Sequence, residues 1–126
     1  MALIMNLCLG LNDISIAEIT EINHDKTELY GMGKKHTNEI AWQRQSTIYQ
    51  YSVQKSIDGI TDWQEIGEIV PKEVKSKCKL LSITDENPTI NGFYRVVVIE
   101  NNQIIYTYDK IQINRNVEEL TSLYSA

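Results

Sequence analysis

The chain has 126 residues, 42% of them hydrophobic, which is enough to bury one core without metal ions or disulfides as staples. Its formal charge is -5 at pH 7, with an isoelectric point near 5.0. Nucleic-acid binding requires clustered Lys and Arg to meet the phosphates, and this charge balance argues against it. The one basic cluster, at residues 72–79, is interpreted as a solvated loop that leads into a strand.

The first residues and the cysteines give no sign of export. Cys8 and Cys78 form no pattern of the kind that small secreted proteins use, so we expect both to be free and buried. The apolar segment at residues 1–11 is about half as long as a membrane-spanning helix. It has no basic n-region and no small-x-small cleavage site, so we expect it to be retained and the chain to be made without export.

The next part of the chain alternates between short extended stretches and turns. β-Branched residues at 13–22 predict a strand with a bulge, and a helix is the alternative. Turn residues at 23–26 and an extended piece at 27–32 would complete a hairpin with that strand. A further short strand is predicted at residues 39–45.

The clearest strand signal lies at residues 49–54. Tyr and Val alternate there with Gln and Ser, at the period of a half-buried antiparallel strand. Turn residues follow at 56–59, and residues 63–70 continue as a strand in which Gly67 marks a bulge or a site of close approach. Pro71 ends this strand, because proline has no N–H to donate to a ladder.

The remaining stretches complete an all-β pattern. Residues 78–84 form a strand that is followed by a turn at 85–92. Strands at 93–100 and 104–113 flank a turn at 101–103, which predicts a second hairpin. Seven or eight short strands without a crossover helix between them indicate an antiparallel β-sandwich or barrel.

The ends of the chain differ from this pattern. We divide the sequence into an apolar N-terminal arm at 1–11, a β-sandwich domain at 12–115 and a tail at 116–126, in which Asn116 caps a short amphipathic helical turn. Both ends need a surface to cover their apolar side chains, so we expect them to bind protein partners. The residues expected to make these contacts are Leu3, Ile4, Met5, Leu7, Leu9, Leu11, Val117, Leu120 and Tyr124.

A series of residues between positions 53 and 96 resembles a known family. The series comprises Val53-Gln54-Lys55-Ser56, Asp58-Gly59, Trp63, Ile66-Gly67, Thr84-Asp85, Asn87-Pro88 and Gly92-Phe93-Tyr94-Arg95-Val96. In order and spacing it resembles the fibronectin type III-like modules common in proteins of Bacteroidetes bacteria and their viruses. The resemblance covers residues 49–115 and implies an immunoglobulin-like antiparallel β-sandwich, whereas residues 1–45 match the family poorly.

The same resemblance suggests a structural role for Tyr94. A tyrosine near the start of this strand can hydrogen-bond back to the preceding corner and so hold the connection between the two sheets. Two residues later an antibody domain has its second cysteine, and this chain has Val96. The resemblance therefore implies the branch of the fold that lacks the inter-sheet disulfide.

We find no pattern for catalysis, metal binding or a cofactor. Neither histidine has a second Cys or His at metal-ligand spacing, and the glycines at 31–33 lack the context of a phosphate-binding loop. The acid pairs at 85–86 and 118–119 would point to opposite faces of an extended chain. The acids near predicted loop ends match no calcium-loop signature. We therefore expect no enzyme activity and no cofactor.

The strand predicted at 93–100 has apolar residues at both odd and even positions, so both of its faces are apolar. One face would pack on the core, and the other would need a cover of its own. Tyr106 and Tyr108 share one parity of the next strand and would place aromatic surface outward. Either the chain termini or another molecule would then cover this face.

Three functions from different classes remain. The preferred one is a non-enzymatic structural protein of a virion, as an auxiliary capsid or head-tail component of a tailed bacteriophage. It would be made in the host cytoplasm and bind capsid or connector subunits, without nucleic acid or membrane; part of this preference is fold-level analogy. The alternative is a surface adhesion or carbohydrate-binding module with Trp42, Trp63, Tyr106 and Tyr108 as stacking platforms, against which the missing export signal argues. An enzyme or regulatory subunit is the third, without a feature in its favour.

Overall fold

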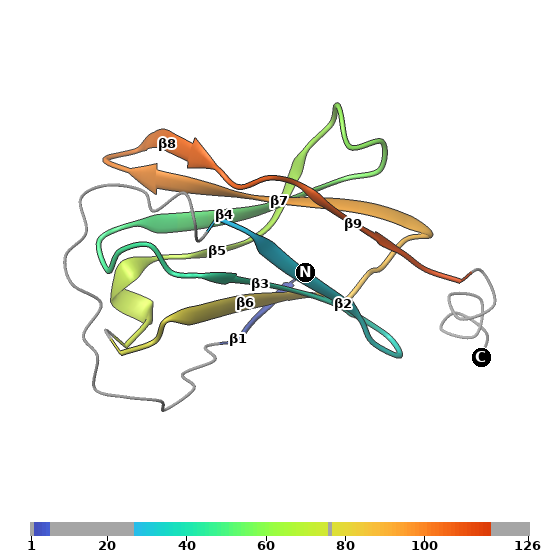
Figure 1. Ribbon diagram of the computed structural model, residues 1–126, viewed down its shortest axis with the longest axis horizontal. Coiled ribbons are helices and arrows are strands. Elements are labelled where there is room, and N and C mark those ends of the chain that lie inside the picture. The colour runs from blue at the N-terminus through green and yellow to red at the C-terminus, as the bar shows by residue number, and fades with distance from the viewer. Residues whose placement is uncertain (1, 6–26, 76, 117–126) are drawn as a thin grey trace.

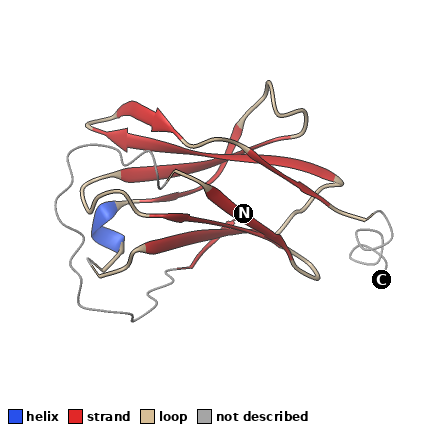
Figure 2. Cartoon of the chain, in the orientation of Figure 1, coloured by secondary structure: helices blue, strands red, loops and turns tan. Residues whose placement is uncertain are grey.

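The computed structural model describes residues 2–5, 27–75 and 77–116. Over these ranges the chain forms two antiparallel β-sheets that pack face to face (Figures 1 and 2). The prediction of an all-β sandwich is thus confirmed. The strand or helix predicted at 13–22 and the helical turn predicted in the tail lie outside the described residues.

The first sheet has the N-terminal strand at one edge. Its order is β1 (Ala2–Met5), β6 (Leu80–Asp85), β3 (Asn38–Gln43) and β2 (Leu29–Gly33). β1 runs antiparallel to β6, with Ala2 opposite Asp85 and Met5 opposite Ser82. The first part of the predicted N-terminal arm is therefore a strand of the sandwich. β2 pairs with β3, whereas the hairpin partner predicted for it at 13–22 is not among the described residues.

The second sheet contains the strands that the sequence marks most clearly. Its order is β5 (Gln64–Ile69), β4 (Gln50–Ser56), β7 (Asn91–Glu100) and β8 (Gln103–Thr107), and β9 (Ile111–Asn114) also pairs with β7. The prediction of one continuous strand at 104–113 is wrong. Between β8 and β9 the chain turns so that the Tyr108 side chain enters the core, while its N–H donates to the Val96 carbonyl at 2.8 Å.

Two irregularities of β5 follow from its sequence. Val53 lies opposite Gly67 and Gln54 opposite Glu65, so Ile66 is the extra residue of a β-bulge beside the predicted Gly67. β5 ends at Ile69, and Pro71 opens a 3-10 turn (η2, Pro71–Glu73), drawn in blue in Figure 2. Both features agree with the sequence prediction. The bulge and the proline each interrupt the hydrogen-bond ladder of β5.

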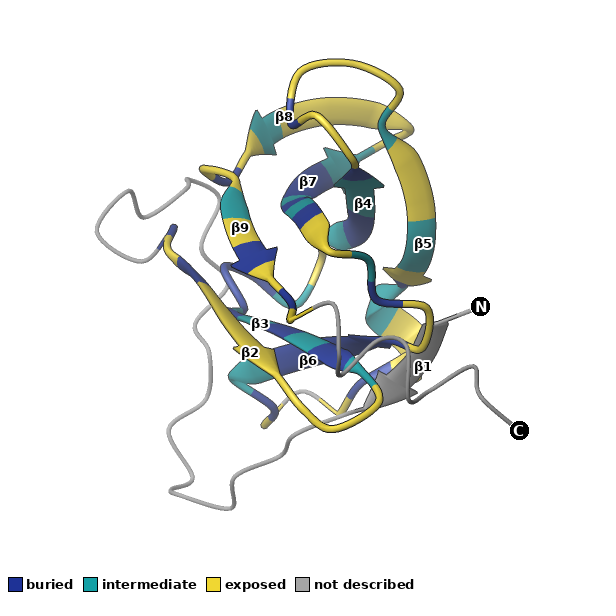
Figure 3. Ribbon diagram, turned by 90° about the vertical axis from the view of Figure 1, so that its right-hand side faces the viewer, coloured by how far each residue is buried: buried dark blue, intermediate teal, exposed yellow. Residues whose placement is uncertain are grey.

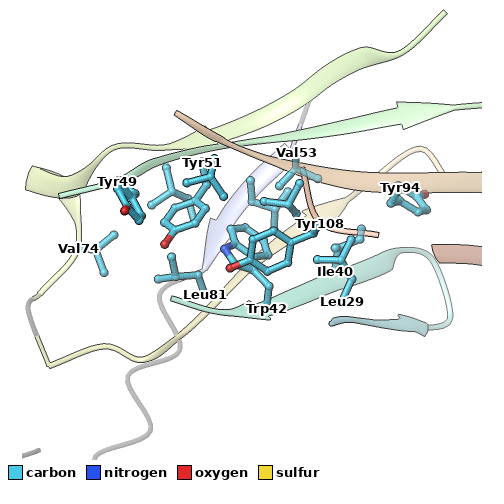
Figure 4. Close-up of a cluster of buried hydrophobic side chains, with 14 of the residues drawn as sticks. Leu29, Ile40, Trp42, Tyr49, Tyr51, Val53, Val74, Leu81, Tyr94 and Tyr108 are labelled. Atoms are coloured by element: carbon cyan, nitrogen blue, oxygen red, sulfur yellow. The ribbon is translucent and has the colours of Figure 1, made fainter. Parts of the chain in front are cut away.

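The core lies between the two sheets and is rich in aromatic rings (Figure 4). The inward-facing half of the predicted alternation is confirmed, since Tyr49, Tyr51 and Val53 are at most 1% exposed. Of the residues between and after them, Gln50 and Gln54 are partly exposed, whereas Ser52 is buried. Trp42 from the opposite sheet packs against Tyr51, with ring centroids 5.7 Å apart. The Tyr51 hydroxyl accepts a hydrogen bond from the Gln45 N–H at 2.8 Å, and burial raises its pKa to about 12. The Tyr51 hydroxyl therefore stays protonated at any physiological pH.

Glycine lets the two sheets approach each other at one side, where β2 lies against β9 (Figure 3). A Cβ atom at Gly31 would lie 2.6 Å from Ile111 Cδ1 and 2.9 Å from Ile113 Cδ1. A larger residue at this position would force either β2 or the two isoleucine side chains to shift.

Cys78 is buried and belongs to a disulfide, so the expectation of two free cysteines is wrong. Disulfide formation depends on the distance between two Cα atoms in the fold, which the spacing of two cysteines in a sequence does not reveal. The other cysteine of the chain, Cys8, lies outside the described residues.

Candidate functional site

One end of the sandwich gathers the polar side chains of both sheets. The loops between β2 and β3, β4 and β5, and β6 and β7 all lie at this end, on the right in Figure 1. It contains a buried hydrogen-bond network and, beside it, an open pocket. Lys55 belongs to both.

The network joins two neighbouring pairs of residues, one from each sheet. Asn38 lies opposite Asp85 in the first sheet, and Lys55 lies opposite Tyr94 in the second. The Tyr94 hydroxyl donates to Asp85 Oδ2 at 2.6 Å and accepts from Asn38 Nδ2 at 2.8 Å. Lys55 Nζ lies 2.7 Å from the same Asp85 oxygen. The four side chains therefore connect the sheets through polar contacts inside an otherwise apolar core.

Arg115 extends this network to the loop between β2 and β3. Its guanidinium is buried, and Nη1 donates to Asn38 Oδ1 and to the Thr37 carbonyl, each at 2.8 Å. Nη2 donates to the carbonyl oxygens of Lys34 and Lys35. A planar group with five donors suits this task, since one side chain satisfies several loop carbonyls at once.

The network favours a charged Asp85 beside a neutral Tyr94. Burial opposes the charged carboxylate, but the hydrogen bonds from Lys55, Tyr94 and the Asn87 N–H outweigh it and lower the pKa of Asp85 below 3.8. Burial and the hydrogen bond to Asp85 raise the pKa of Tyr94. Every polar group of this set is engaged in holding the fold, which suits a structural role better than proton transfer.

The pocket lies between the loop after β4 and the start of β5, and its volume is about 780 Å³. Its lining residues are Lys55, Ser56, Ile57, Asp58, Thr61, Asp62, Trp63, Gln64, Ile66 and Thr89. Trp63 is the aromatic residue of this lining. The Arg95 guanidinium stacks on its ring, 4.3 Å from the centroid, and Arg95 Nε donates to Gln54 Oε1 at 2.7 Å. The indole therefore has a fixed orientation at the pocket wall.

Asp58 organises the loop that forms one side of the pocket. Its carboxylate accepts from the N–H groups of Thr61 at 2.8 Å and Ile60 at 2.9 Å, and from the Thr61 hydroxyl at 2.7 Å. These hydrogen bonds lower the pKa of Asp58, and the one donated by the Thr61 N–H has the largest effect. Gly59 has a positive φ of 74° and lies against the Phe93 ring, which confirms the predicted turn at 56–59.

This ordered loop presents apolar side chains to solvent. Ile57 is 71% exposed and Ile60 is 75% exposed, the two largest values among the large hydrophobic residues that the structure describes. Lys110 Nζ donates to the Gly59 carbonyl at 2.7 Å and so ties the loop to the opposite side of the sheet. The two isoleucines are thus held in place by neighbours rather than by burial.

The predicted site residues have different outcomes. Tyr94 hydrogen-bonds back to the corner before its strand, as its position suggested. Leu3, Ile4 and Met5 lie in β1. The other predicted contact residues lie outside the described part of the chain: Leu7, Leu9, Leu11, Val117, Leu120 and Tyr124.

The predicted stacking platforms are mostly parts of the core. Trp42 and Tyr108 are at most 1% exposed, and the Tyr108 hydroxyl donates to the Gln43 carbonyl at 2.8 Å. Tyr106 is partly buried and packs edge-on against Tyr108, with ring centroids 5.9 Å apart. The expectation that these two tyrosines form an outward aromatic surface is therefore wrong for Tyr108. Trp63 is partly exposed and lines the pocket, with the Arg95 guanidinium stacked on its ring.

Sequence reasoning did not predict the network around Tyr94. One signal was present: Lys55 continues the inward parity of Tyr51 and Val53, and a lysine at such a position needs a buried anion. Asp85 belongs to the segment that resembles the family, but its pairing with Lys55 depends on the packing of the two sheets. No local signal marked Arg115.

The described residues contain neither a cluster of metal ligands nor a membrane-spanning helix. No three His, Cys, Asp or Glu residues there converge as a metal site. No helix in the same part of the chain is long and apolar enough to cross a membrane. Comparison of the sequence with protein-family models, with curated proteins and with solved structures finds no match.

Proposed function

We propose that this chain is a non-enzymatic structural protein of a virion, an auxiliary capsid or head-tail component of a tailed bacteriophage, built on a fibronectin type III-like module. In this role it binds neighbouring capsid or connector subunits. The observation that carries the proposal is an apolar loop surface that is ordered before any partner is bound.

The strand order supports the fibronectin type III-like, immunoglobulin-like assignment. If β2, β3, β4, β5, β6 and β7 are strands A, B, C, C′, E and F, and β8 with β9 is strand G, the sheets read A-B-E and C′-C-F-G. This is the partition of strands in immunoglobulin-like sandwiches. β1 then occupies the place beside E that strand D takes in the constant-type domain.

The loop with Ile57 and Ile60 supports a role in assembly. When a partner covers large exposed apolar side chains, the complex is stabilised by about 25 cal/mol per Å² of buried apolar area. Binding is tighter when the surface does not have to be ordered first. The hydrogen bonds of Asp58 and Lys110 already fix this loop, so the cost of ordering it has been met during folding.

The disulfide of Cys78 is compatible with this role. Disulfides persist in extracellular and periplasmic proteins and on the surfaces of virions and cells, whereas the bacterial cytoplasm keeps thiols reduced. A virion protein made in the cytoplasm would acquire the bond after release of the particle. A module exported to a cell surface would acquire it during export.

The first test is particle association. Mass spectrometry of density-purified particles from a phage that encodes the chain should find it in a fixed ratio to the major capsid protein. The double variant Ile57→Ser/Ile60→Ser should lower this ratio, while Met32→Ser, which changes a residue that is 59% exposed on β2, should leave it unchanged. Absence of the chain from purified particles defeats the proposal.

A second test addresses the terminal segments, whose contacts remain predictions. Because residues 2–5 form β1, a deletion of 2–11 would remove an edge strand. Replacing residues 6, 7 and 9–11 by Gly and Ser spares β1 and Cys8 and removes Leu7, Leu9 and Leu11. We expect reduced incorporation into particles, whereas the same replacement at residues 21–26 serves as the control.

A carbohydrate-binding module is the second candidate, because the pocket combines Trp63 with carboxylate and amide side chains. Sugars stack on an aromatic ring while planar polar groups hydrogen-bond their hydroxyls. A glycan array should then give a signal that Trp63→Ala removes and Tyr30→Ala, a change at an exposed tyrosine of β2, does not. A flat array would exclude this candidate.

A further inference from the structure

β8 is an edge strand that projects from the second sheet. It pairs with β7 on one side, and none of the described strands pairs with its other side (Figure 1). Asn101 and Asn102 adopt positive φ angles of 52° and 62° in the tight turn that joins it to β7. The backbone N–H and C=O groups along the outer side of β8 therefore have no ladder partner within the described chain.

The side chains of β8 lack the features that usually protect an edge. Ile104 is 65% exposed and Ile105 is 40% exposed, and residues 101–108 carry no charge. Natural edge strands commonly carry charged residues or proline that prevent pairing with another chain. The one protective feature of β8 is a bulge at Ile105, since Tyr106 lies opposite Val98 and Ile104 opposite Ile99.

The other described edges are protected or covered. β5 carries Glu65 and Glu68 together with its bulge at Ile66, so two copies of this strand would repel each other. β2 lies against β9, where Gly31 meets the side chains of Ile111 and Ile113. β1 lies near β5 at the opposite side of the sandwich. β8 is therefore the described edge that has neither a charge nor a neighbouring sheet to block it.

We propose that two copies of this chain associate through β8, side by side and antiparallel about a twofold axis near Ile105. A twofold contact joins the same strand of both copies, so each residue meets a residue of the same segment. Because this segment is uncharged, the contact brings together no like charges, although each copy has a net charge of -5. The bulge limits the ladder to a few hydrogen bonds, and packing of Ile104 and Ile105 across the axis supplies the apolar contact.

This inference concerns the isolated protein and does not rest on the proposed virion role. Sedimentation velocity at rising concentration should show the chain moving from its monomer mass of 14.5 kDa toward twice that mass. Ile104→Lys should weaken the association at least about tenfold, since it places two ammonium groups beside the axis. Added salt should strengthen the wild-type dimer by screening the repulsion between two acidic molecules.

Met32→Lys is the matched control. It introduces the same charge at a similarly exposed apolar residue, on β2 of the other sheet, and should leave the association unchanged. Because Ile104 is largely exposed, Ile104→Lys should keep the wild-type melting temperature, which separates loss of contact from loss of fold.

Three results would overturn the proposal. The wild-type chain could remain a monomer at all concentrations, as it would if β8 paired with a different protein. Ile104→Lys could associate as strongly as the wild type. Met32→Lys could lose association to the same extent, which would make the effect one of net charge.

Discussion

The Tyr94 hydroxyl donates a hydrogen bond of 2.6 Å to Asp85 Oδ2 and thereby joins the two sheets at the end where β6 turns into β7. The same hydroxyl accepts from Asn38, so its donor and acceptor capacities are both used. A buried network of this kind is stabilising only when every member has a partner. Removal of one member should therefore cost more than one average hydrogen bond.

Tyr94→Phe tests this directly. The substitution keeps the ring in the core but leaves Asn38 Nδ2 without its acceptor and Asp85 with one donor fewer. We expect the free energy of unfolding to fall by about 1–3 kcal/mol, the usual cost of leaving a buried polar group unsatisfied. Urea denaturation followed by fluorescence would measure it.

Tyr30→Phe is the control for that measurement, because it removes the same atom from a tyrosine that is 49% exposed. Its stability should stay close to that of the wild type. Equal stability of the Tyr94→Phe and Tyr30→Phe variants would show that the corner hydrogen bonds do not contribute to folding.

The pH dependence of stability should report on Asp85. Its pKa in the folded protein is lowered from the ordinary value of 3.8. The stabilisation linked to this shift is complete above pH 3.8 and is lost as the pH falls through the folded-state pKa. The difference in unfolding free energy between the wild type and Asp85→Asn should therefore be largest near neutral pH and shrink below about pH 4.

Asp109→Asn serves as the comparison, because Asp109 is an exposed acid outside the network. The gap between this variant and the wild type should change little over the same pH range. If the difference in unfolding free energy between the wild type and Asp85→Asn stayed constant from pH 7 to strongly acidic conditions, the charge of Asp85 would not contribute to stability.

The strands with a strict two-residue period could be predicted from sequence, and those shaped by tertiary packing could not. Tyr49, Tyr51 and Val53 alternate with polar residues because one face of β4 is buried, and the alternation marks that face. The break between β8 and β9 has no such mark. It exists because Tyr108 reaches the Gln43 carbonyl of the opposite sheet, a contact across 65 residues.

The candidate site shows the same division. The turn at 56–59 was predictable, since Ser, Asp and Gly satisfy the backbone of a tight turn locally. The network of Asn38, Lys55, Asp85 and Tyr94 depends on which residues face one another across the sheets. The pocket beside Trp63 likewise depends on how the loop folds over the start of β5, and no short sequence pattern encodes that.

Asp58→Ala should loosen the pocket loop without unfolding the sandwich. The alanine side chain cannot accept the hydrogen bonds that Asp58 receives from Ile60 and Thr61. We expect the amide protons of these two residues to exchange with solvent faster, while amides of β4 and β7 keep their protection. Hydrogen exchange followed by NMR would resolve both groups of amides.

Asp109→Ala, another exposed aspartate substitution, should leave those exchange rates unchanged. The role assigned to Asp58 would be lost if the exchange of Ile60 and Thr61 were the same in Asp58→Ala and in the wild type. Faster exchange throughout β4 would instead mean that the loop supports the whole sheet.

Gly31→Ala should destabilise the sandwich where β2 meets β9. The added methyl group would lie 2.6 Å from Ile111 Cδ1, closer than two carbon atoms can approach, so β2 or the isoleucine must move. Overpacking of this kind costs about 1–3 kcal/mol. Gly33→Ala adds the same methyl group two residues further along β2, where its nearest neighbour is the Arg115 Cδ atom at an ordinary 3.4 Å. Thermal denaturation should therefore show a lower melting temperature for Gly31→Ala than for Gly33→Ala. If the two variants melted together, close contact with β9 would not be the reason for glycine at position 31.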